Sequence, residues 1–410
     1  MTEDYNMQDY LYWRGDIPFS TDPFNEVDNL ILAQASYVDF DGIVPESGDD
    51  KIPIREVYNQ YWLMHTKEEI MQRKSFVKLA PFLLEPLAVS RRFGNMKLSG
   101  YVNHINKDTQ AQMSAVRFEL DDGSVYVAFR GTDETLVGWK EDFNLSFMSQ
   151  TEGQRLAVEY MKANFSDTNL WLRVGGHSKG GNFAVYASAF SGDAVNRQIM
   201  EVYTNDGPGF RPEVTGTSEY RNILKKTISI VPRDSVIGWL LSSELTPRVV
   251  MSSATRIRQH DALTWQIKGN RFVKTEQSKE SWMLEKTLSD WLVNVDDESR
   301  KIFVDQIFNI LEATGADTMK DVRTATLSDL AEAFQAAINL PKDQQKEVSE
   351  VLTQLFKSGE KTFYEQLENI EGWIPPFIRK WAARKEEALS GEKTDDEPGS
   401  DPFEDNGKEN

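Results

Sequence analysis

The feature that most constrains the fold of this chain is a serine held between glycines, Gly-His-Ser-Lys-Gly-Gly at residues 176–181. An apolar run typical of a β-strand, residues 170–175 (LWLRVG), comes directly before it. A segment rich in alanine and glycine, residues 180–191, follows it with the composition of a closely packed helix. This order predicts a strand, a sharp turn at the serine and a helix, which is the setting that a nucleophilic serine requires.

The glycines on either side have a steric reason. A Cβ at Gly176 or Gly180 would collide with the neighbouring strand and helix. The turn exposes the hydroxyl of Ser178 above the sheet and aims the N–H of Lys179 at a forming oxyanion. We therefore interpret Ser178 as a candidate nucleophile and the Lys179 N–H as one donor of an oxyanion hole.

Strand-like runs recur on both sides of this turn. Residues 112–119 and 124–130 flank Asp121-Asp122-Gly123, which is a hairpin signal. A helix is expected at 152–164, and further strands are expected at 199–204, 227–232 and 248–252. Strands alternating with helices predict an α/β fold with a largely parallel sheet covered on both faces.

The two ends of the chain read as helical. Helices are expected before the sheet at 26–40, 53–64 and 67–91, and after it at 281–297, 299–314, 327–339, 343–357 and 361–370. We divide the chain into an N-terminal helical segment packed on the core (1–99), a catalytic core (100–275), a C-terminal helical region (276–390) and an acidic tail (391–410).

Charge and composition exclude several functions. The net charge of −19 argues against nucleic acid as a partner, because phosphates require a basic surface. The tail 391–410 has eight acidic residues and only two lysines, and Phe403 is its one large apolar residue. We therefore expect it to be disordered. The sequence does not indicate a protein partner for it. The absence of cysteine, of a secretory signal and of a membrane span favours a cytoplasmic protein.

A serine nucleophile needs a base, and histidine suits that role near neutral pH. The chain has four: His65, His104, His177 and His260. In this kind of fold the partners follow in the order serine, acid, histidine, which leaves His260.

The acid should follow a strand that lies between Ser178 and His260. Asp234 follows the run 228–231, and Asp206 follows the run 202–204. We prefer Asp234, because Asp206 precedes Gly-Pro and also reads as a turn aspartate. Asp206 stays the alternative.

The second oxyanion donor should come from a loop after an earlier strand. The run 125–132 ends in Arg130-Gly131-Thr132, where Gly131 permits a close backbone approach and Thr132 offers an N–H and a hydroxyl. Asp142, ten residues further on, is expected to pair with Arg130 and hold this loop in place.

Together these segments resemble a known family. The segments AFRGT followed by W..D, GHSKGG, VYTNDGPGF, IVPRDSV and a later histidine, over about residues 110–265, are similar to class 3 lipases. They are more similar still to an uncharacterised bacterial lipase-like family. The resemblance implies an α/β-hydrolase fold with Ser178 as nucleophile, Asp234 as acid, His260 as base and Thr132 in the oxyanion hole.

The function expected from these residues is hydrolysis of a carboxylic ester through a Ser-His-Asp triad and an acyl-enzyme. The substrate would be a small-molecule or lipid-like ester, including a fatty-acyl or phospholipid ester, and no metal or organic cofactor is implied. Two alternatives remain: an acyltransferase or thioesterase with the same triad, and a non-enzymatic interaction protein. Lys179, where the family commonly has leucine, either favours an anionic substrate or faces solvent. The short interval between Asp142 and the serine strand leaves little room for a lid.

Overall fold

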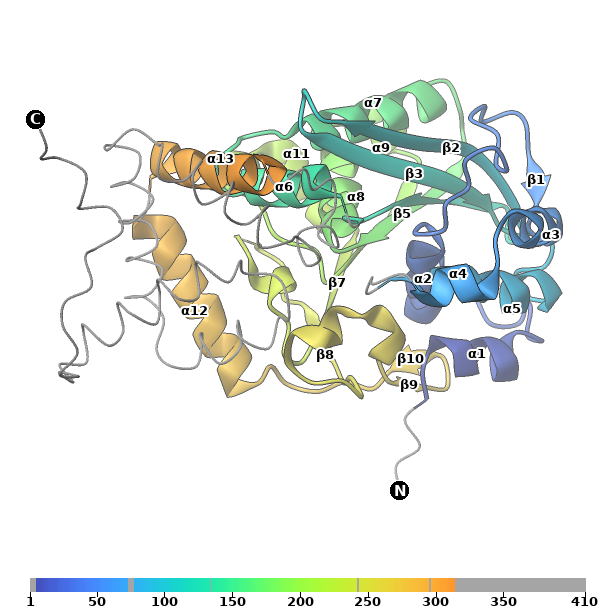
Figure 1. Cartoon of the computed structure of the whole chain (residues 1–410). Helices are drawn as coiled ribbons and strands as arrows, with labels where there is room; N and C mark the ends of the chain where they lie inside the picture. Colours follow the sequence, from blue (N-terminus) through green and yellow to red (C-terminus); the bar gives the residue numbers. More distant parts are fainter. Residues whose placement is uncertain (1–4, 73–76, 134, 242, 295, 314–410) are drawn as a thin grey trace, which may run out of the picture. The chain divides into compact units, whose positions relative to one another are not determined.

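The computed structural model describes residues 5–72, 77–133, 135–241, 243–294 and 296–313 (Figure 1). The chain divides into two compact units, Met1–Glu298 and Ser299–Asn410. Helices and 3₁₀ turns (η) are α1 Met7–Arg14, α2 Glu26–Ala35, α3 Ile54–Met64, α4 Lys67–Gln72, η1 Ala80–Leu83, α5 Leu84–Val89, α6 Leu136–Asn144, α7 Glu152–Phe165, α8 Lys179–Phe190, α9 Asp193–Asn196, α10 Pro212–Thr215, α11 Ser218–Leu224, η2 Ile237–Trp239, η3 Arg256–His260, η4 Ala262–Thr264, α12 Lys279–Asn294 and α13 Asp297–Ala313.

The first unit is built on a sheet whose strands lie side by side in the order of the sequence. Strands β1 to β4 pair antiparallel, and β4 to β8 pair parallel. The strands are β1 Ile52–Pro53, β2 Lys97–Asn106, β3 Ala111–Glu119, β4 Ser124–Phe129, β5 Trp171–His177, β6 Ile199–Asn205, β7 Thr227–Pro232 and β8 Arg248–Val250, with a separate short pair, β9 Ile267–Lys268 and β10 Arg271–Phe272. This is an α/β-hydrolase-like sheet flanked by helices.

Alternating side chains of the strands enter two different cores. On β4, Val125, Val127 and Phe129 join one buried cluster, which includes residues of α7, α8 and α11. Tyr126 and Ala128 join the other cluster, which contains residues of α1 to α5. Successive side chains of a strand point to opposite faces of a sheet, so every residue of β4 is buried.

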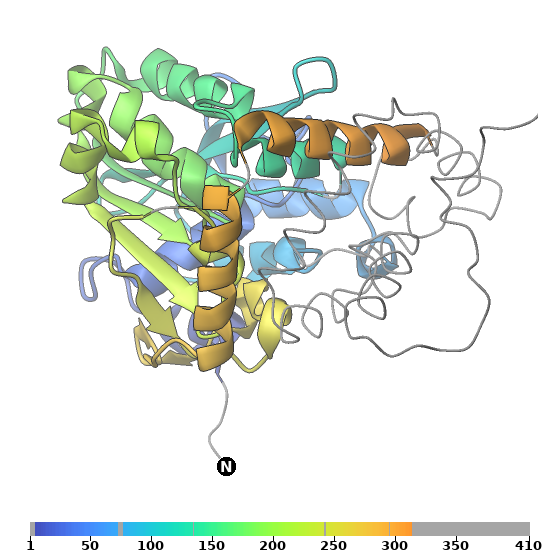
Figure 2. The same ribbon diagram turned by 90° about the vertical axis from the view of Figure 1, so that its left-hand side faces the viewer.

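The order of the strands explains which helices cover which face. A crossover between neighbouring parallel strands is almost always right-handed, so strands added in sequence place all their crossover helices on one face. Helices α7, α8 and α11 occupy that face, and the N-terminal helices occupy the other (Figures 1 and 2). The sheet therefore needs the N-terminal helices to bury its second face.

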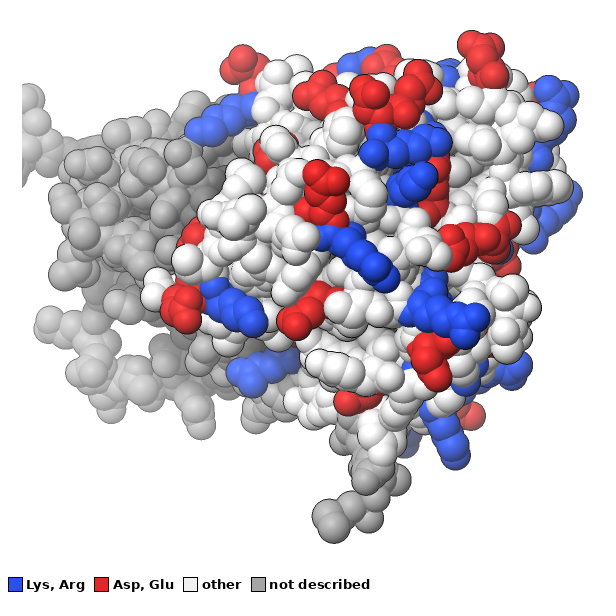
Figure 3. Space-filling model, turned by 90° about the vertical axis from the view of Figure 1, so that its right-hand side faces the viewer, with Lys and Arg blue, Asp and Glu red and all other residues white. Residues whose placement is uncertain are grey.

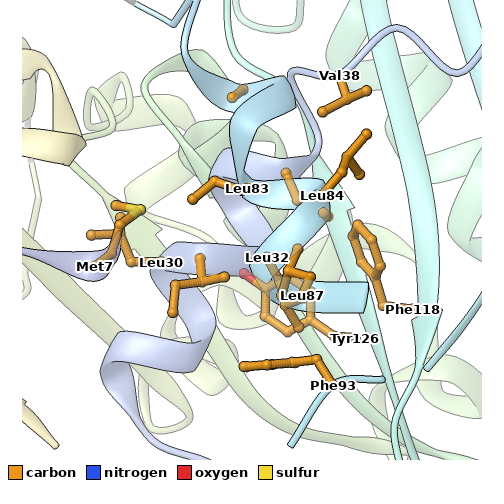
Figure 4. Close-up of a cluster of buried hydrophobic side chains, with 14 of the residues drawn as sticks. Met7, Leu30, Leu32, Val38, Leu83, Leu84, Leu87, Phe93, Phe118 and Tyr126 are labelled. Carbon is orange, nitrogen blue, oxygen red and sulfur yellow. The ribbon is translucent and has the colours of Figure 1, made fainter. Parts of the chain in front are cut away.

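Between that second face of the sheet and the N-terminal helices lies a continuous apolar core (Figure 4). Leu32 of α2 and Leu87 of α5 lie in one buried cluster with Phe118 of β3 and Tyr126 of β4. Burying a side chain of this size stabilises the fold by roughly 1.5–3 kcal/mol. The N-terminal segment is thus part of the core rather than an appendage to it.

Some sequence predictions need correction. The strand β2, Lys97–Asn106, was not predicted, and the expected helix 67–91 is divided into α4, η1 and α5, with turn residues 77–79 before η1 and with η1 leading directly into α5. Near the C-terminus, α12 and α13 correspond to the helices expected at 281–297 and 299–314. The helices expected at 327–339, 343–357 and 361–370, and the tail 391–410, lie outside the described residues.

The surface carries charges of both signs. On the face shown in Figure 3, acidic and basic side chains are interspersed. In the described part of the chain, no helix is long and apolar enough to cross a membrane.

Candidate active site

The turn at Ser178 has the strained geometry that its sequence predicts. Ser178 follows the last residue of β5 and precedes α8, with φ 57° and ψ −134°. A Cβ at Gly176 would lie 2.3 Å from the carbonyl oxygen of Gly180, and one at Gly180 would lie 2.1 Å from that of Phe129. Contacts this short leave no space for any side chain, which is why glycine stands at both positions.

The register of the parallel strands brings the other candidate segments to the same edge. Gly176 pairs with Phe129 of β4, and His177 pairs with Asn205 of β6. The residues that follow these strands therefore meet at the carboxyl end of the sheet, where open α/β sheets bind ligands. A Cβ on Gly131 would lie 3.1 Å from the Cβ of Ser178, so the loop after β4 passes directly beside the serine.

The carboxylate that His260 contacts is Asp206. The Nδ1 atom of His260 lies 2.7 Å from Oδ2 of Asp206, whose side chain is only 1% exposed. The other oxygen of Asp206 accepts hydrogen bonds from the hydroxyl of Ser235 and, at 3.1 Å, from the N–H of Gly238. Asp206 is thus a buried, fully hydrogen-bonded carboxylate facing a histidine.

The expectation that Asp234 contacts His260 is therefore corrected. Asp234 pairs instead with the residue next to the histidine: Gln259 Nε2 donates to Asp234 Oδ2 at 2.7 Å, and the Asp234 N–H donates to Gln259 Oε1 at 3.0 Å. The reason is positional. Asp206 directly follows β6, the immediate neighbour of β5, whereas Asp234 follows β7, one strand further away.

His177, next to the serine, supports the loop that carries His260. Its Nε2 lies 2.9 Å from the carbonyl oxygen of His260, and its Nδ1 lies 2.9 Å from the hydroxyl of Tyr37. Because a carbonyl only accepts, Nε2 carries the proton and Nδ1 accepts from Tyr37. Burial, together with the adjacent His260, holds the pKa of His177 well below 6.5, so its ring stays neutral.

A second tether to this loop comes from Trp265, which is fully buried and donates its indole N–H to the carbonyl of Gln259 at 2.7 Å. The supporting residues Tyr37, His177, Gln259 and Trp265 were not predicted as part of the site. For Gln259 and Trp265 the only sequence signal is their place beside His260. Tyr37 gives no such signal, because it is 140 residues from its partner.

The candidate oxyanion loop is held by Asp142, but not through Arg130. The hydroxyl of Thr132 donates to Asp142 Oδ2 at 2.5 Å. Arg130 contacts Asn103 at 2.9 Å and Asp133 at 3.5 Å. The expected pairing of Asp142 with Arg130 is therefore wrong, although Asp142 does hold the loop by another route.

The position of the Lys179 side chain fits neither of the two possibilities considered for it, which were to face solvent or to favour an anionic substrate. Its side chain is fully buried, and its Nζ contacts Glu141 Oε2 at 3.1 Å and Gln112 Oε1 at 2.8 Å. A buried ammonium compensated in this way neither faces solvent nor presents a charge to a substrate. Its backbone N–H is at the first position of α8, where helix geometry provides no intrahelical acceptor.

Two further observations bear on the chemistry. Between the described atoms of Ser178 and His260 there is no hydrogen bond, and contacts of this type are often long until a substrate is bound. Among the described residues, no group of three His, Asp or Glu side chains is arranged to hold a metal ion.

A mostly parallel sheet flanked by helices, with a serine in a strained strand-to-helix turn at its carboxyl edge, is the arrangement of the α/β-hydrolase fold. A family profile described as Mbeg1-like matches residues 87–309, and the chain belongs to this lipase-like family. Among solved structures, the crystal structure of M37 lipase is similar with a TM-score of 0.31 and 14% identity, over 43% of this chain and 70% of that chain. A search of curated proteins finds no match.

Proposed function

We propose that this protein is a serine hydrolase that cleaves carboxylic esters, with Ser178 as nucleophile, His260 as base and Asp206 as acid. The observation that carries the proposal is the hydrogen bond between His260 and the buried Asp206, on the loop beside the strained turn of Ser178. A buried carboxylate on one nitrogen of a histidine fixes the other nitrogen as a proton acceptor.

In the proposed reaction, His260 Nε2 takes the proton from the Ser178 hydroxyl while Oγ attacks the ester carbonyl. Asp206 accepts from Nδ1–H and stabilises the imidazolium that forms. His260 then gives the proton to the leaving alcohol, which leaves an acyl group on Ser178. Water attacks this acyl-enzyme by the same route, and the acid is released.

The negative charge on the carbonyl oxygen needs donors that are in place before the reaction. We assign this role to the N–H groups of Lys179 and Thr132. The Lys179 N–H begins α8, so the positive end of the helix dipole also lies at this point. Thr132 is oriented by its hydroxyl hydrogen bond to Asp142.

The setting of Lys179 favours an uncharged acyl group. Since the ammonium of Lys179 is buried and paired with Glu141, its charge does not attract an anionic acyl chain. The substrates expected are small-molecule or lipid-like esters, including fatty-acyl esters. Transfer of the acyl group to an added alcohol, in place of release of free acid, would instead indicate an acyltransferase.

The test is covalent labelling with a fluorophosphonate, followed by mass spectrometric mapping of the modified residue. The expected result is modification of Ser178 and loss of both labelling and p-nitrophenyl butyrate hydrolysis in Ser178→Ala. The matched control is Ser188→Ala, a buried serine on α8, the helix that follows Ser178. Full activity in a folded Ser178→Ala protein, or labelling that maps elsewhere, would refute the assignment.

A further inference from the structure

The ammonium group of Lys179 is fully satisfied inside the protein. Its three N–H donors face three acceptors: Gln112 Oε1 at 2.8 Å, Glu141 Oε2 at 3.1 Å and the carbonyl oxygen of Gly138 at 3.3 Å. Burying a charge is costly unless it is paired and hydrogen-bonded in this way. The proposed reaction uses the backbone N–H of Lys179 and gives its side chain no part.

The partner of Lys179 connects several elements. Glu141, on α6, is completely buried. Its Oε2 also accepts the N–H of Gln112 on β3 at 2.9 Å, and its Oε1 accepts the N–H of Gly153 in the first turn of α7 at 2.7 Å. The ion pair therefore fixes α6 to β3, α7 and α8.

The helix α6 also carries Asp142, the residue that holds Thr132. Asp142 Oδ2 accepts the hydroxyl of Thr132 at 2.5 Å, while its Oδ1 lies 4.0 Å from Lys179 Nζ. The backbone of Lys179 thus offers one proposed oxyanion donor, and its side chain reaches the segment that fixes the other.

We propose that the side chain of Lys179 is a positioning group for the oxyanion hole, which keeps Asp142 a carboxylate and α6 in register so that Thr132 stays aimed at the reacting carbonyl. This inference rests on the proposed ester hydrolysis. It predicts that removing the charge of Lys179 changes the activity through the protonation of Asp142, rather than through binding of the substrate.

The charges around Asp142 determine the direction in which each substitution should shift its pKa. Burial raises the pKa of Asp142 to about 6, the cation of Lys179 and the hydroxyl of Thr132 oppose that rise, Glu141 adds to it, and a protonated His260 opposes it. Tyr37 also lies near enough for Asp142 to influence it. Removing the charge of Lys179 therefore raises the pKa of Asp142 further, and removing the charge of Glu141 lowers it.

The experiment compares Lys179→Met with Glu141→Gln, two substitutions that break the same ion pair. For Lys179→Met we expect the acid limb of the kcat/KM profile to move up by about one pH unit, so that kcat falls about twofold near pH 7 and close to tenfold near pH 5, with little change in KM. The deficit should shrink at higher pH. For Glu141→Gln the acid limb should move to lower pH. If the ion pair served folding alone, both substitutions would lower the activity, and their acid limbs would not move in opposite directions.

Asp142→Asn provides the matched background, because asparagine keeps the shape and cannot titrate. In Asp142→Asn, adding Lys179→Met should leave the acid limb in place and cost little more activity. A shift that persists there would mean that Lys179 acts directly on His260, which overturns the inference. If Glu141→Gln does not fold, the double variant Lys179→Met/Glu141→Gln takes its place in the comparison, because it buries no net charge.

The assay is p-nitrophenyl butyrate hydrolysis, sampled across pH and read at one common pH, alongside the rate of fluorophosphonate labelling. If the unmodified protein neither hydrolyses the ester nor is labelled at Ser178, the proposed function fails. If it does both and the profiles of Lys179→Met and Glu141→Gln coincide with it, only the role of Lys179 fails.

Discussion

Replacing Asp206 by asparagine is the sharpest test of the proposed triad, because the structure makes this substitution almost free of steric effects. Asn Oδ1 can still accept from Ser235 and from the N–H of Gly238, as the carboxylate does. Asp206 has a φ of +50°, in the left-handed region that asparagine tolerates better than most residues. The backbone and the buried contacts should therefore survive in Asp206→Asn.

What changes is the atom that faces His260. With Oδ1 kept by Ser235 and Gly238, the amide nitrogen takes the place of Oδ2, 2.7 Å from the histidine Nδ1. An N–H at that point favours the tautomer with an unprotonated Nδ1, which moves the proton to Nε2, the nitrogen that must act as base. For a triad of this kind, the loss in kcat is about 10⁴-fold, or about 5.5 kcal/mol of barrier.

Asp234→Asn is the matched control. Its amide oxygen can still accept from Gln259 Nε2, and its backbone N–H still donates to Gln259 Oε1. We expect kcat within about threefold of the unmodified protein, because the two hydrogen bonds with Gln259 are kept and the weakening of a single hydrogen bond costs only about 1 kcal/mol. The measurement is kcat on p-nitrophenyl butyrate at pH 8, with thermal unfolding of both variants as the check on folding.

The reasoning would be refuted by the opposite ranking. If Asp234→Asn lost several orders of magnitude and Asp206→Asn stayed active, the hydrogen bond from His260 to Asp206 would have no catalytic role. Equal, small losses in both variants would show that the acid contributes little and would place catalysis in the oxyanion hole.

Two other predictions concern the support of His260 and the form of the substrate. His177→Leu removes the donor to the His260 carbonyl and should lower kcat about fivefold, whereas His177→Gln retains a donor and should be less affected; equal kinetics in the two variants would contradict this positioning role. For the substrate, the interval after Asp142 is occupied by α6, α7 and their connection, so we expect ordinary saturation with dispersed short-chain esters. A steep rise in rate at the critical micelle concentration would show that some part of the chain serves as a lid.

The serine turn could be predicted from sequence because its signature is local. Gly176 and Gly180 are each two residues from Ser178, although the atoms that exclude a side chain at Gly180 belong to β4 and the loop that follows it. The hydrophobic pattern likewise indicated the strands around it. The sequence order of serine, acid and histidine left His260 as the one candidate base, and the structure places that residue beside an aspartate.

The choice between Asp206 and Asp234 depended on geometry that no local pattern contains. Both follow an apolar strand, and the Gly-Pro after Asp206 is typical of a turn. Asp206 is in such a turn and also faces the site, because its positive φ redirects its side chain. The resemblance to class 3 lipases pointed to Asp234, whereas the aspartate that His260 contacts follows the strand next to the serine strand.

Lys179 shows the same limit for a buried charge. Its partners, Glu141 and Gln112, lie 38 and 67 residues away in the sequence. From sequence alone, a lysine beside a proposed nucleophile is expected to be exposed. Its burial becomes evident only in the folded structure, where elements distant in the sequence enclose its side chain.

The N-terminal segment illustrates how fold and site depend on one another. Because the strands follow one another in order, right-handed crossovers leave one face of the sheet uncovered, and α1 to α5 supply the missing layer. Tyr37 follows α2 in this layer and donates to His177, which in turn holds the carbonyl of His260. The helices needed to bury the sheet therefore also fix the proposed base. We therefore expect a fragment limited to residues 100–275 to lose both the layer that covers the sheet and this support of the proposed base.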